Sequence, residues 1–341
     1  MDKQLGIAII GTGYWGINYV RVFNELPQTK VVAVCDQRSE RLQKVERRFP
    51  GTTLTTELAE VLSRDDVDAV VVATPATTHY QVAHACLTAG KHVLVEKPIT
   101  IKAANAENLV NLAESKGVTL MVGHIFLYNA GVRKVKDCLN QDDASRVYYV
   151  YAQRTNLGPI RDDVNALWDL APHDVSIFNY LLDSTPSWVS ATGSKLLQNC
   201  CEDVGFISLG YQDGIVGHIH VSWADPNKVR EVVVVSNDKR IVFDDIKTME
   251  QVRIFEKGIS YEEVDAPSSY GEFRFLVRDG DIISPRIEAN EPLKSQCSHF
   301  IECITQNKRP FTDGQAGLQV VQVMEAIDRS LAQNGAPVQV G

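Results

Sequence analysis

The apolar residues of the chain change their spacing part-way along it. Up to about residue 123, short apolar runs lie at 7–10, 30–35, 69–73, 92–95 and 119–122. The segments between them predict helices at 15–24, 41–49, 58–64, 80–89 and 103–116. Buried strands that alternate with helices are typical of a doubly wound parallel sheet. We therefore expect an α/β domain over residues 1–123.

From residue 146 onward, apolar and polar positions alternate with a period of two. These segments lie at 147–154, 188–194, 203–211, 215–223, 230–235 and 239–243. Alternation of this kind predicts an open, mainly antiparallel sheet with two different faces. Helices are expected mainly at 172–182, 294–306 and 315–333, and loops or edge strands at 258–292. Because a chain of 341 residues exceeds the usual size of one core, we predict a second α/β domain over residues 124–341.

A glycine-rich turn joins the first predicted strand to the first predicted helix. Gly11 allows the tight turn, Gly13 lets the backbone approach a pyrophosphate, and Gly16 lets the helix lie close to the strand. The free N–H groups of the helix would hold the phosphates. The pattern predicts a Rossmann dinucleotide site. Its residues are Gly11, Thr12, Gly13, Tyr14, Trp15 and Gly16.

An acidic residue ends the second apolar run, where a βαβ unit places the partner of the adenine ribose. Asp36 follows Gly16 by twenty residues. Its carboxylate would accept a hydrogen bond from the ribose 2′-hydroxyl and repel a 2′-phosphate, which favours NAD. Arg38 leaves NADP open, since a nearby guanidinium can pair with that phosphate.

Composition narrows the class of protein. The seven cysteines are scattered and include an adjacent pair, and no CxxC occurs, so we expect a reducing cytoplasm and no zinc motif. The net charge of −9 argues against nucleic-acid and acidic-membrane partners. No apolar run approaches a membrane span, and the first residues leave no room for a signal peptide. His218 and His220 share a strand face but lack further ligands, so we expect no metal.

Two segments at strand ends carry candidate chemistry. Glu96-Lys97-Pro98 follows the fourth run, and Lys97 there can stabilise the negative oxygen that develops when an alcohol is oxidised, while Pro98 can fix the turn through a cis bond. The bland alternative is a solvent-facing loop lysine. Thr74, Pro75 and His79 follow the third run. They are expected beside the cofactor, as are Glu96 and Lys97, and His124 follows the fifth run.

A second candidate group lies at the start of a helix in the second domain. We expect Pro172 in the first helical turn and Asp169 near its cap, with His173 about one turn later on the same side. Asp169 could hold one ring nitrogen and leave the other free to act as a base, since a neutral imidazole suits a secondary alcohol. An N-cap aspartate beside a structural histidine is the competing interpretation.

The polar residues just before this helix offer contacts for a substrate. Arginine forks, amides and an aromatic face are what a sugar with an anionic group requires. A solvated loop is the alternative. The candidates are Arg154, Asn156, Arg161, Asp163, Asn165 and Trp168, with Lys97 and His173 expected to touch the same substrate.

Taken together, these motifs resemble the Gfo/Idh/MocA family of nicotinamide enzymes over nearly the whole chain. The resemblance is carried by the glycine turn, Asp36, the loop at 73–75, Glu96-Lys97-Pro98, the segment 169–173 and Asp313-Gly314. It implies that Lys97 and His173 serve catalysis and that Asp169 assists. It also implies oligomer contacts through the C-terminal sheet, as a homodimer or a homotetramer.

Within that family, residues 154–174 and 223–231 are similar to the branch of bacterial polysaccharide biosynthesis. Members of this branch oxidise C3 of a UDP-linked N-acetylated hexuronic acid with NAD, so the resemblance implies a nucleotide-sugar dehydrogenase. Arg154, Arg161, Lys228 and Arg230 give an otherwise acidic chain a local set of cations for the nucleotide. A free sugar, inositol or sugar acid is the alternative substrate. A regulator that binds NAD without turnover is a further alternative, although such relatives are expected to lose the lysine or the histidine.

Overall fold

The computed structural model describes residues 4–141, 146–158, 160–161, 164–197, 201–261 and 275–341. Contacts divide the chain into two units. The first comprises residues 1–128 and 290–325, and the second comprises residues 129–289 and 326–341. The first unit thus takes in a late segment that the predicted boundary at residue 123 placed in the second domain. Helix α9 (Gly314–Ala332) begins in the first unit and ends in the second.

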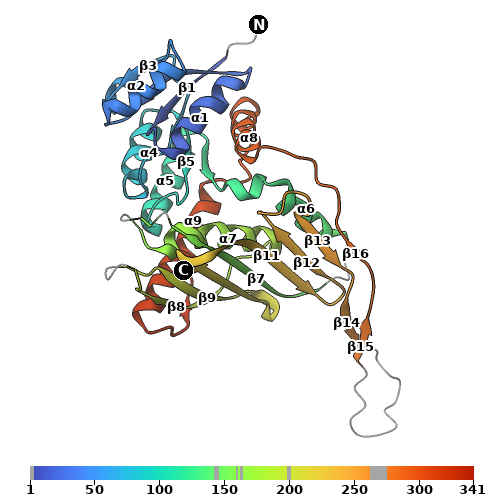
Figure 1. Cartoon of the computed structure of the whole chain (residues 1–341). Helices are drawn as coiled ribbons and strands as arrows, with labels where there is room; N and C mark the ends of the chain where they lie inside the picture. Colours follow the sequence, from blue (N-terminus) through green and yellow to red (C-terminus); the bar gives the residue numbers. More distant parts are fainter. Residues whose placement is uncertain (1–3, 142–145, 159, 162–163, 198–200, 262–274) are drawn as a thin grey trace, which may run out of the picture. The chain divides into compact units, whose positions relative to one another are not determined.

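The first unit contains the predicted parallel sheet (Figure 1). Its strand order is β3-β2-β1-β4-β5-β6, with every neighbouring pair parallel. The order reverses beside β1, which is the switch point where doubly wound sheets bind ligands. The strands are β1 (Leu5–Ile10), β2 (Thr29–Cys35), β3 (Thr53–Thr55), β4 (Ala69–Val72), β5 (His92–Glu96) and β6 (Leu120–Gly123).

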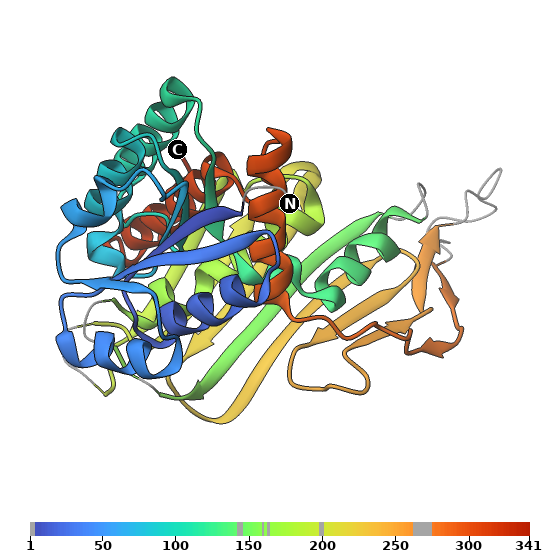
Figure 2. The same cartoon turned by 90° about the horizontal axis from the view of Figure 1, so that it is seen from above.

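The helices of this unit match the predicted ones closely, and one more helix joins them from the C-terminal part of the chain. The predicted helix at 294–306 is α8 (Pro292–Gln306), which packs against α1 (Figure 2). Its Cys297 and Phe300 belong to the same buried core as Tyr19 and Phe23 of α1. The other elements are α1 (Tyr14–Glu25), α2 (Ser39–Arg48), α3 (Leu58–Leu62), α4 (His79–Thr88), α5 (Ala103–Lys116) and the 3₁₀ turns η1 (Ala76–Thr78) and η2 (Ile125–Tyr128).

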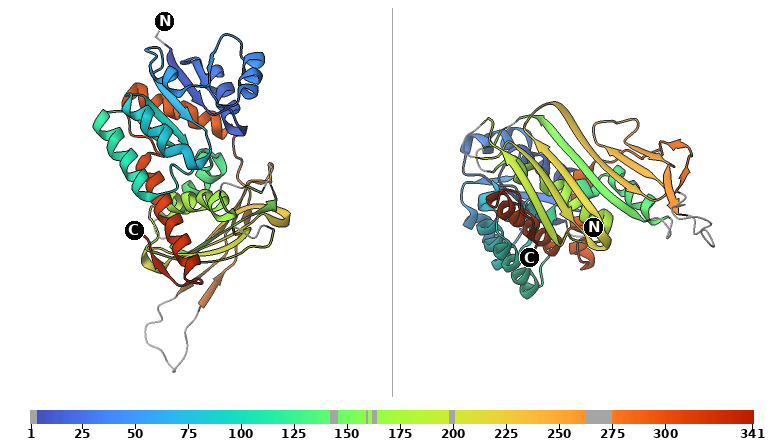
Figure 3. Two further views of the ribbon diagram at one scale, coloured as in Figure 1. Left: turned by 90° about the vertical axis from the view of Figure 1, so that its left-hand side faces the viewer. Right: turned by 90° about the horizontal axis from the view of Figure 1, so that it is seen from below.

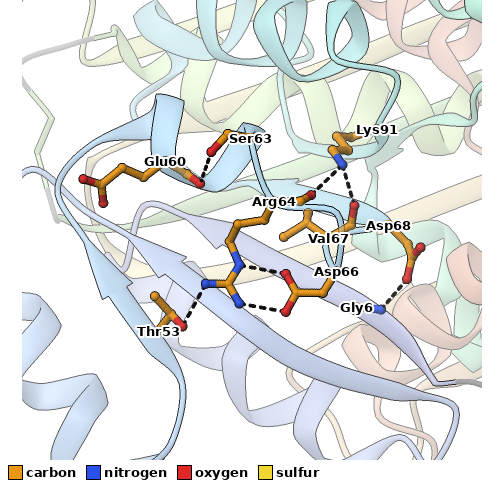
Figure 4. Close-up of polar contacts among 9 residues, drawn as sticks. All are labelled: Gly6, Thr53, Glu60, Ser63, Arg64, Asp66, Val67, Asp68 and Lys91. Carbon is orange, nitrogen blue, oxygen red and sulfur yellow. Dashed lines mark hydrogen bonds and ion pairs between the residues drawn. The ribbon is translucent and has the colours of Figure 1, made fainter.

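Polar residues at the amino-terminal ends of these strands satisfy one another (Figure 4). Arg64 donates two hydrogen bonds to Asp66, of 2.8 and 2.7 Å, and Asp68 accepts one of 2.7 Å from the Gly6 N–H. The Lys91 ammonium donates to two backbone carbonyls. This edge of the sheet is therefore closed by its own hydrogen bonds.

The second unit is organised around a sheet of nine strands, as predicted mainly antiparallel (Figure 3). Its order is β16-β13-β12-β11-β7-β10-β9-β8-β17, and among the described strands of this sheet only the pair β7–β10 is parallel. A separate two-stranded ribbon, β14–β15, lies within the segment predicted as loops or edge strands. The strands are β7 (Val147–Leu157), β8 (Trp188–Ser194), β9 (Val204–Gly210), β10 (Val216–Ser222), β11 (Ala224–Ser236), β12 (Arg240–Asp244), β13 (Val252–Phe255), β14 (Gly258–Tyr261), β15 (Phe275–Arg278), β16 (Ile282–Ile283) and β17 (Val338–Gln339).

Helices α6 (Ala130–Asn140) and α7 (Ala166–Leu182) cover one face of this sheet (Figure 1), and η3 (Gln212–Gly214) is a short 3₁₀ turn. The prediction omitted α6, and it was wrong about the start of α7. The helix begins at Ala166 because Asn165 caps it, which places Pro172 inside the helix rather than in its first turn. Asp169 and His173 consequently lie four residues apart in one continuous helix.

The six described cysteines are free, and five of them are buried. Among the helices of the described ranges, none has the length and apolar character that crossing a membrane requires.

Candidate active site

The glycine turn combines two crowded positions with one open position. Gly11 has a φ of +90°, and a Cβ on Gly16 would lie 1.9 Å from the Gly11 carbonyl oxygen, so both glycines are required by this chain's own backbone. A Cβ on Gly13 would have the Arg41 Nη1 as its nearest neighbour, at 3.7 Å. The space in front of Gly13 is open, and it is where the pyrophosphate of a dinucleotide fits.

The start of α1 also suits a pyrophosphate. Gly13 is the N-cap residue and supplies no side-chain hydrogen bond, and the first turn carries no acidic residue. The first N–H groups of a helix have no partner within the helix. Tyr14 and Trp15 flank the turn, with exposed fractions of 81% and 39%. The residues present therefore fit the phosphates of NAD.

Asp36 lies between the turn and the start of α2. It accepts hydrogen bonds from the Thr12 N–H and hydroxyl, at 2.7 and 2.8 Å, and from the Arg38 N–H, at 2.9 Å. Burial works to raise the pKa of Asp36, but these hydrogen bonds outweigh it and the pKa lies below its ordinary value. The carboxylate is thus ionised, as an acceptor for ribose hydroxyls must be. Arg41, which sequence reasoning missed, lies 3.5 Å from the same carboxylate.

His79 links the loop after β4 to the loop after β5. Its ring is buried, with Nδ1 2.7 Å from the Pro98 carbonyl oxygen and Nε2 2.9 Å from the Thr74 carbonyl oxygen. Pro75 precedes η1 in the same loop. The predicted cofactor contact His79 therefore directs both ring nitrogens at the protein's own backbone.

Lys97 lies at the carboxyl end of β5, and its peptide bond to Pro98 is cis, as the sequence allowed. Glu96 and Gly123 are register partners on β5 and β6, so Lys97 and His124 are the next residues of two adjacent strands. His124 is 2% exposed, and neither ring nitrogen has a hydrogen-bond partner within the described residues. Burial, and then the charge of Lys97, lowers the pKa of His124 to about 4. A neutral imidazole therefore lies beside the candidate lysine.

In the second unit, α7 carries Asp169 and His173 on one face, because residues four apart in a helix are neighbours. The Asp169 carboxylate accepts a hydrogen bond of 2.9 Å from Arg161 Nη1 and one of 3.3 Å from Trp223 Nε1. Sequence reasoning missed the role of Trp223, a buried indole that follows β10 directly. These contacts hold Asp169 one helical turn before His173.

The other predicted substrate residues have partners within the second unit. Arg154 makes two hydrogen bonds to Asp174, of 3.0 and 2.7 Å, and both side chains are buried. Trp168 Nε1 donates to both carboxylate oxygens of Asp328. Asn165 caps α7 by accepting from the Trp168 N–H at 2.9 Å, and it donates to Glu202.

From the predicted substrate set before α7, Arg161 contacts the Asp169 carboxylate. Asn156 donates a hydrogen bond to the Gly158 carbonyl. Asp163 lies outside the described residues.

Two family models match successive parts of the chain. Residues 5–124 match the model of the oxidoreductase family with an NAD-binding Rossmann fold, and residues 132–242 match the Gfo/Idh/MocA C-terminal domain. The chain belongs to the Gfo/Idh/MocA family. It is therefore an NAD-binding oxidoreductase, and the predicted fold class and cofactor are confirmed.

Several members of the family align with the chain over nearly its whole length. UDP-N-acetylglucosamine 3-dehydrogenase of Acidithiobacillus ferrooxidans is 26% identical over 95% of this chain and 97% of its own. The scyllo-inositol 2-dehydrogenase (NAD+) of Bacillus subtilis is 24% identical over 100% and 97%. Other matches are shorter: the chain spans 58% of the length of 4-carboxy-2-hydroxymuconate-6-semialdehyde dehydrogenase of Sphingobium, at 29% identity.

Solved structures of family members share the fold. GenD2 from gentamicin A biosynthesis, in complex with NAD, has a TM-score of 0.83 and 26% identity, over 100% of this chain and 97% of its own. WlbA of Bordetella pertussis, in complex with NADH and UDP-GlcNAcA, has a TM-score of 0.80 and 22% identity, over 99% of both chains.

Proposed function

We propose that this member of the Gfo/Idh/MocA family is an NAD-dependent dehydrogenase that oxidises a secondary hydroxyl of a nucleotide-activated sugar, C3 of a UDP-N-acetyl-hexuronic acid, in polysaccharide biosynthesis. One observation carries the proposal: Lys97 directly follows β5 at the cofactor edge of the first unit, while Asp169 and His173 lie one turn apart on α7 of the second. The proposal requires Lys97 and His173 to meet at the substrate.

The chemistry follows from the ordinary properties of these side chains. Neutral His173 takes the proton of the sugar hydroxyl, since an imidazole has an ordinary pKa near neutrality. Lys97 donates a hydrogen bond to the same oxygen and stabilises the negative charge that develops on it. Asp169, held by Arg161 and Trp223, orients His173 and stabilises its charged form. Bound NAD supplies the hydride acceptor.

The substrate class rests on the relatives. The UDP-N-acetylglucosamine 3-dehydrogenase aligns over nearly the full chain, and the WlbA structure contains UDP-GlcNAcA. In this chain, Lys228 is exposed on β11 and Arg230 is partly exposed, so both are accessible to a phosphate. The alignment with scyllo-inositol 2-dehydrogenase favours a second candidate, a free polyol.

Hydride transfer tests the proposed chemistry. Lys97→Met should lower the rate of NADH formation by about 10²-fold or more, because one electrostatic donor to a developing oxyanion typically contributes that much. NAD affinity, measured by calorimetry, should change little. Lys116→Met, which removes an exposed lysine at the end of α5, should behave as the unchanged protein. A Lys97→Met variant that keeps most of its rate would contradict the mechanism.

A substrate panel tests the proposed sugar. UDP-N-acetylglucosaminuronic acid, UDP-N-acetylglucosamine, scyllo-inositol and free hexuronic acids are each offered with NAD, and kcat/KM is compared. We expect the UDP-hexuronate to give the highest value. Turnover of the polyol alone would favour the second candidate, and no turnover alongside tight NAD binding would favour the regulator.

We further propose a homo-oligomer formed through the outer face of the nine-stranded sheet, in the cytoplasm. Tyr149, Phe206 and Val216 on that face are 45%, 45% and 43% exposed. The free cysteines suit a reducing compartment. Phe206→Asp should lower the mass measured by light scattering from that of a dimer or tetramer, and an unchanged mass would argue against this face.

A further inference from the structure

A half-buried carboxylate, that of Glu96, lies one residue before Lys97. Glu96 ends β5, and its side chain turns into the first unit rather than toward solvent. Its Oε1 accepts a hydrogen bond of 2.6 Å from the Tyr19 hydroxyl, and its Oε2 accepts one of 3.2 Å from the Lys97 N–H. A Cβ on Gly123 of the adjacent strand would lie 3.3 Å from the same carboxylate. The carboxylate is therefore packed against β6 as well as held by α1.

A third element supports this carboxylate from the late part of the chain. Gln296 of α8 is 0% exposed, and its Nε2 donates a hydrogen bond of 2.8 Å to the Tyr19 hydroxyl oxygen. Tyr19, also 0% exposed, accepts that bond and donates its own proton to Glu96. The hydrogen bonds therefore form one series: Gln296 of α8 donates to Tyr19 of α1, and Tyr19 donates to Glu96, the residue that precedes Lys97.

The hydrogen bonds indicate an ionised Glu96. Each carboxylate oxygen has a donor, which is the pattern of a carboxylate rather than of an acid that must donate a proton itself. Burial raises the pKa of Glu96, while the bond from Tyr19 and the charge of Lys97 work in the other direction. The hydrogen bond from Tyr19 therefore offsets part of the free energy needed to bury the charged form of Glu96.

The charge of Lys97 lowers the pKa of Glu96, and the other titratable groups around this carboxylate are neutral or paired with one another. From α1 comes Tyr19, whose pKa burial raises well above its ordinary value, and from α8 comes the buried thiol of Cys297, whose pKa is raised likewise. Both are neutral near neutral pH. After β6 comes His124, which is neutral because its pKa lies near 4. Arg21 and Glu291 have opposite charges and contact each other.

We propose that Glu96, fixed by Tyr19 and Gln296, is a positioning residue that keeps Lys97 in its ammonium form, so that Lys97 can donate to the substrate oxygen. This inference rests on the proposed function only for its last step. The physical reason is that a partly buried ammonium loses its proton more readily than one in water, whereas an adjacent carboxylate favours the charged form. His124, being neutral, adds no repulsion on the other side.

The pKa of Lys97 can be measured without any substrate. The protein is reductively methylated with ¹³C, the Lys97 resonance is identified by its loss in Lys97→Arg, and the resonance is titrated by NMR. Glu96→Gln should lower the pKa of Lys97 by about 1 or more, the effect of removing one close opposite charge. Asp68→Asn, which neutralises a carboxylate at the amino-terminal ends of the same sheet, should leave it unchanged. Equal values in Glu96→Gln and the unchanged protein would overturn the inference.

Two further variants separate charge from packing. Tyr19→Phe removes a donor that lowers the pKa of Glu96 but keeps the carboxyl group, so the pKa of Lys97 should fall by less than in Glu96→Gln. A fall as large as that of Glu96→Gln would mean that packing, not charge, sets the value, and would count against the inference. If Glu96→Gln does not fold, Glu96→Gln combined with Tyr19→Phe removes the charge together with the hydroxyl that would lose its acceptor. The same fall is expected there.

Activity then connects the inference to catalysis. With the sugar found in the panel, the alkaline limb of the kcat profile should move to lower pH in Glu96→Gln and stay in place in Asp68→Asn. A shifted NMR titration without turnover of any sugar would reject the proposed function and keep the charge assignment. Turnover of a sugar with an unshifted NMR titration would keep the proposed function and reject the charge assignment.

Discussion

The predicted site residues of the two units differ in what surrounds them. In the first unit, Gly13 faces open space, Tyr14 is 81% exposed, and the buried ring nitrogens of His124 have no hydrogen-bond partner among the described residues. In the second unit, Arg154 and Trp168 are buried and already bonded to carboxylates. Since buried polar groups are normally satisfied, the first set indicates contacts that a ligand completes, and the second set indicates a scaffold.

A further contrast within the first unit supports this interpretation. At the amino-terminal strand ends, Arg64, Asp66 and Lys91 satisfy one another and the backbone (Figure 4). At the carboxyl ends, Lys97 and His124 each follow a residue of the register pair Glu96–Gly123, and the half-buried Glu96 carboxylate accepts a hydrogen bond from Tyr19. The polar groups at the amino-terminal ends of the strands therefore bond to one another, whereas the carboxyl ends of the same sheet carry the candidate catalytic lysine.

The strongest test of the scaffold interpretation is Arg154. Arg154→Met should lower the free energy of unfolding by about 3–5 kcal/mol, because it leaves the buried Asp174 carboxylate without a partner. Arg154→Met combined with Asp174→Leu should recover most of this loss, and urea unfolding measures both. If Arg154 instead serves the substrate, stability will hold and KM alone will rise.

The second test concerns His124 and pH. The unfolded imidazole binds its proton from about pH 6.5 downward, whereas the folded one binds it only near pH 4, so the unfolded state holds more protons in between and stability falls as pH falls. Between about pH 7 and about pH 4.5 the resulting loss in the free energy of unfolding is about 2–3 kcal/mol. His124→Gln should lack this part of the pH dependence. The raised pKa of Glu96 acts with the opposite sign, so the comparison is made between the two proteins at each pH.

These cases also explain what the sequence could and could not predict. The glycine turn and Asp36 are local motifs, and short-range spacing was sufficient to find them. The Arg154–Asp174 pair and the series from Gln296 to Glu96 join residues distant in sequence, which periodicity does not detect. Helix α8 was predicted at 294–306, but the spacing of its apolar residues does not say which core its apolar face joins.

The start of α7 was missed for a related reason. Proline is common in the first turn of a helix, which made Pro172 look like a helix start. Asn165 is an equally good start signal, because its side chain can accept from the backbone N–H of a residue in the first turn, and the structure uses it. Where two start signals compete, sequence alone does not rank them.

The open space at Gly13 provides the third test, by comparison with Gly16. Gly13→Ala should keep the unfolding free energy within about 0.5 kcal/mol, because its φ of −66° suits alanine and its Cβ meets no backbone atom. NAD affinity should fall about tenfold or more, since the new methyl occupies the phosphate position. Gly16→Ala should destabilise the protein instead, because its Cβ overlaps the Gly11 carbonyl. Calorimetric titration with NAD and thermal unfolding distinguish the two.

The smallest expected effect, that of Asn165, divides the two interpretations of the second unit most finely. Asn165→Ala should cost about 1 kcal/mol of stability, the usual value for a lost N-cap, and should leave KM for the sugar nearly unchanged. Asn165→Asp keeps the capping oxygen but faces Glu202 with a second negative charge, so it should restore only part of the loss. A tenfold rise in KM in Asn165→Ala with unchanged stability would instead show that Asn165 contacts the substrate. The polar segment before α7 would then bind the substrate as well as start the helix.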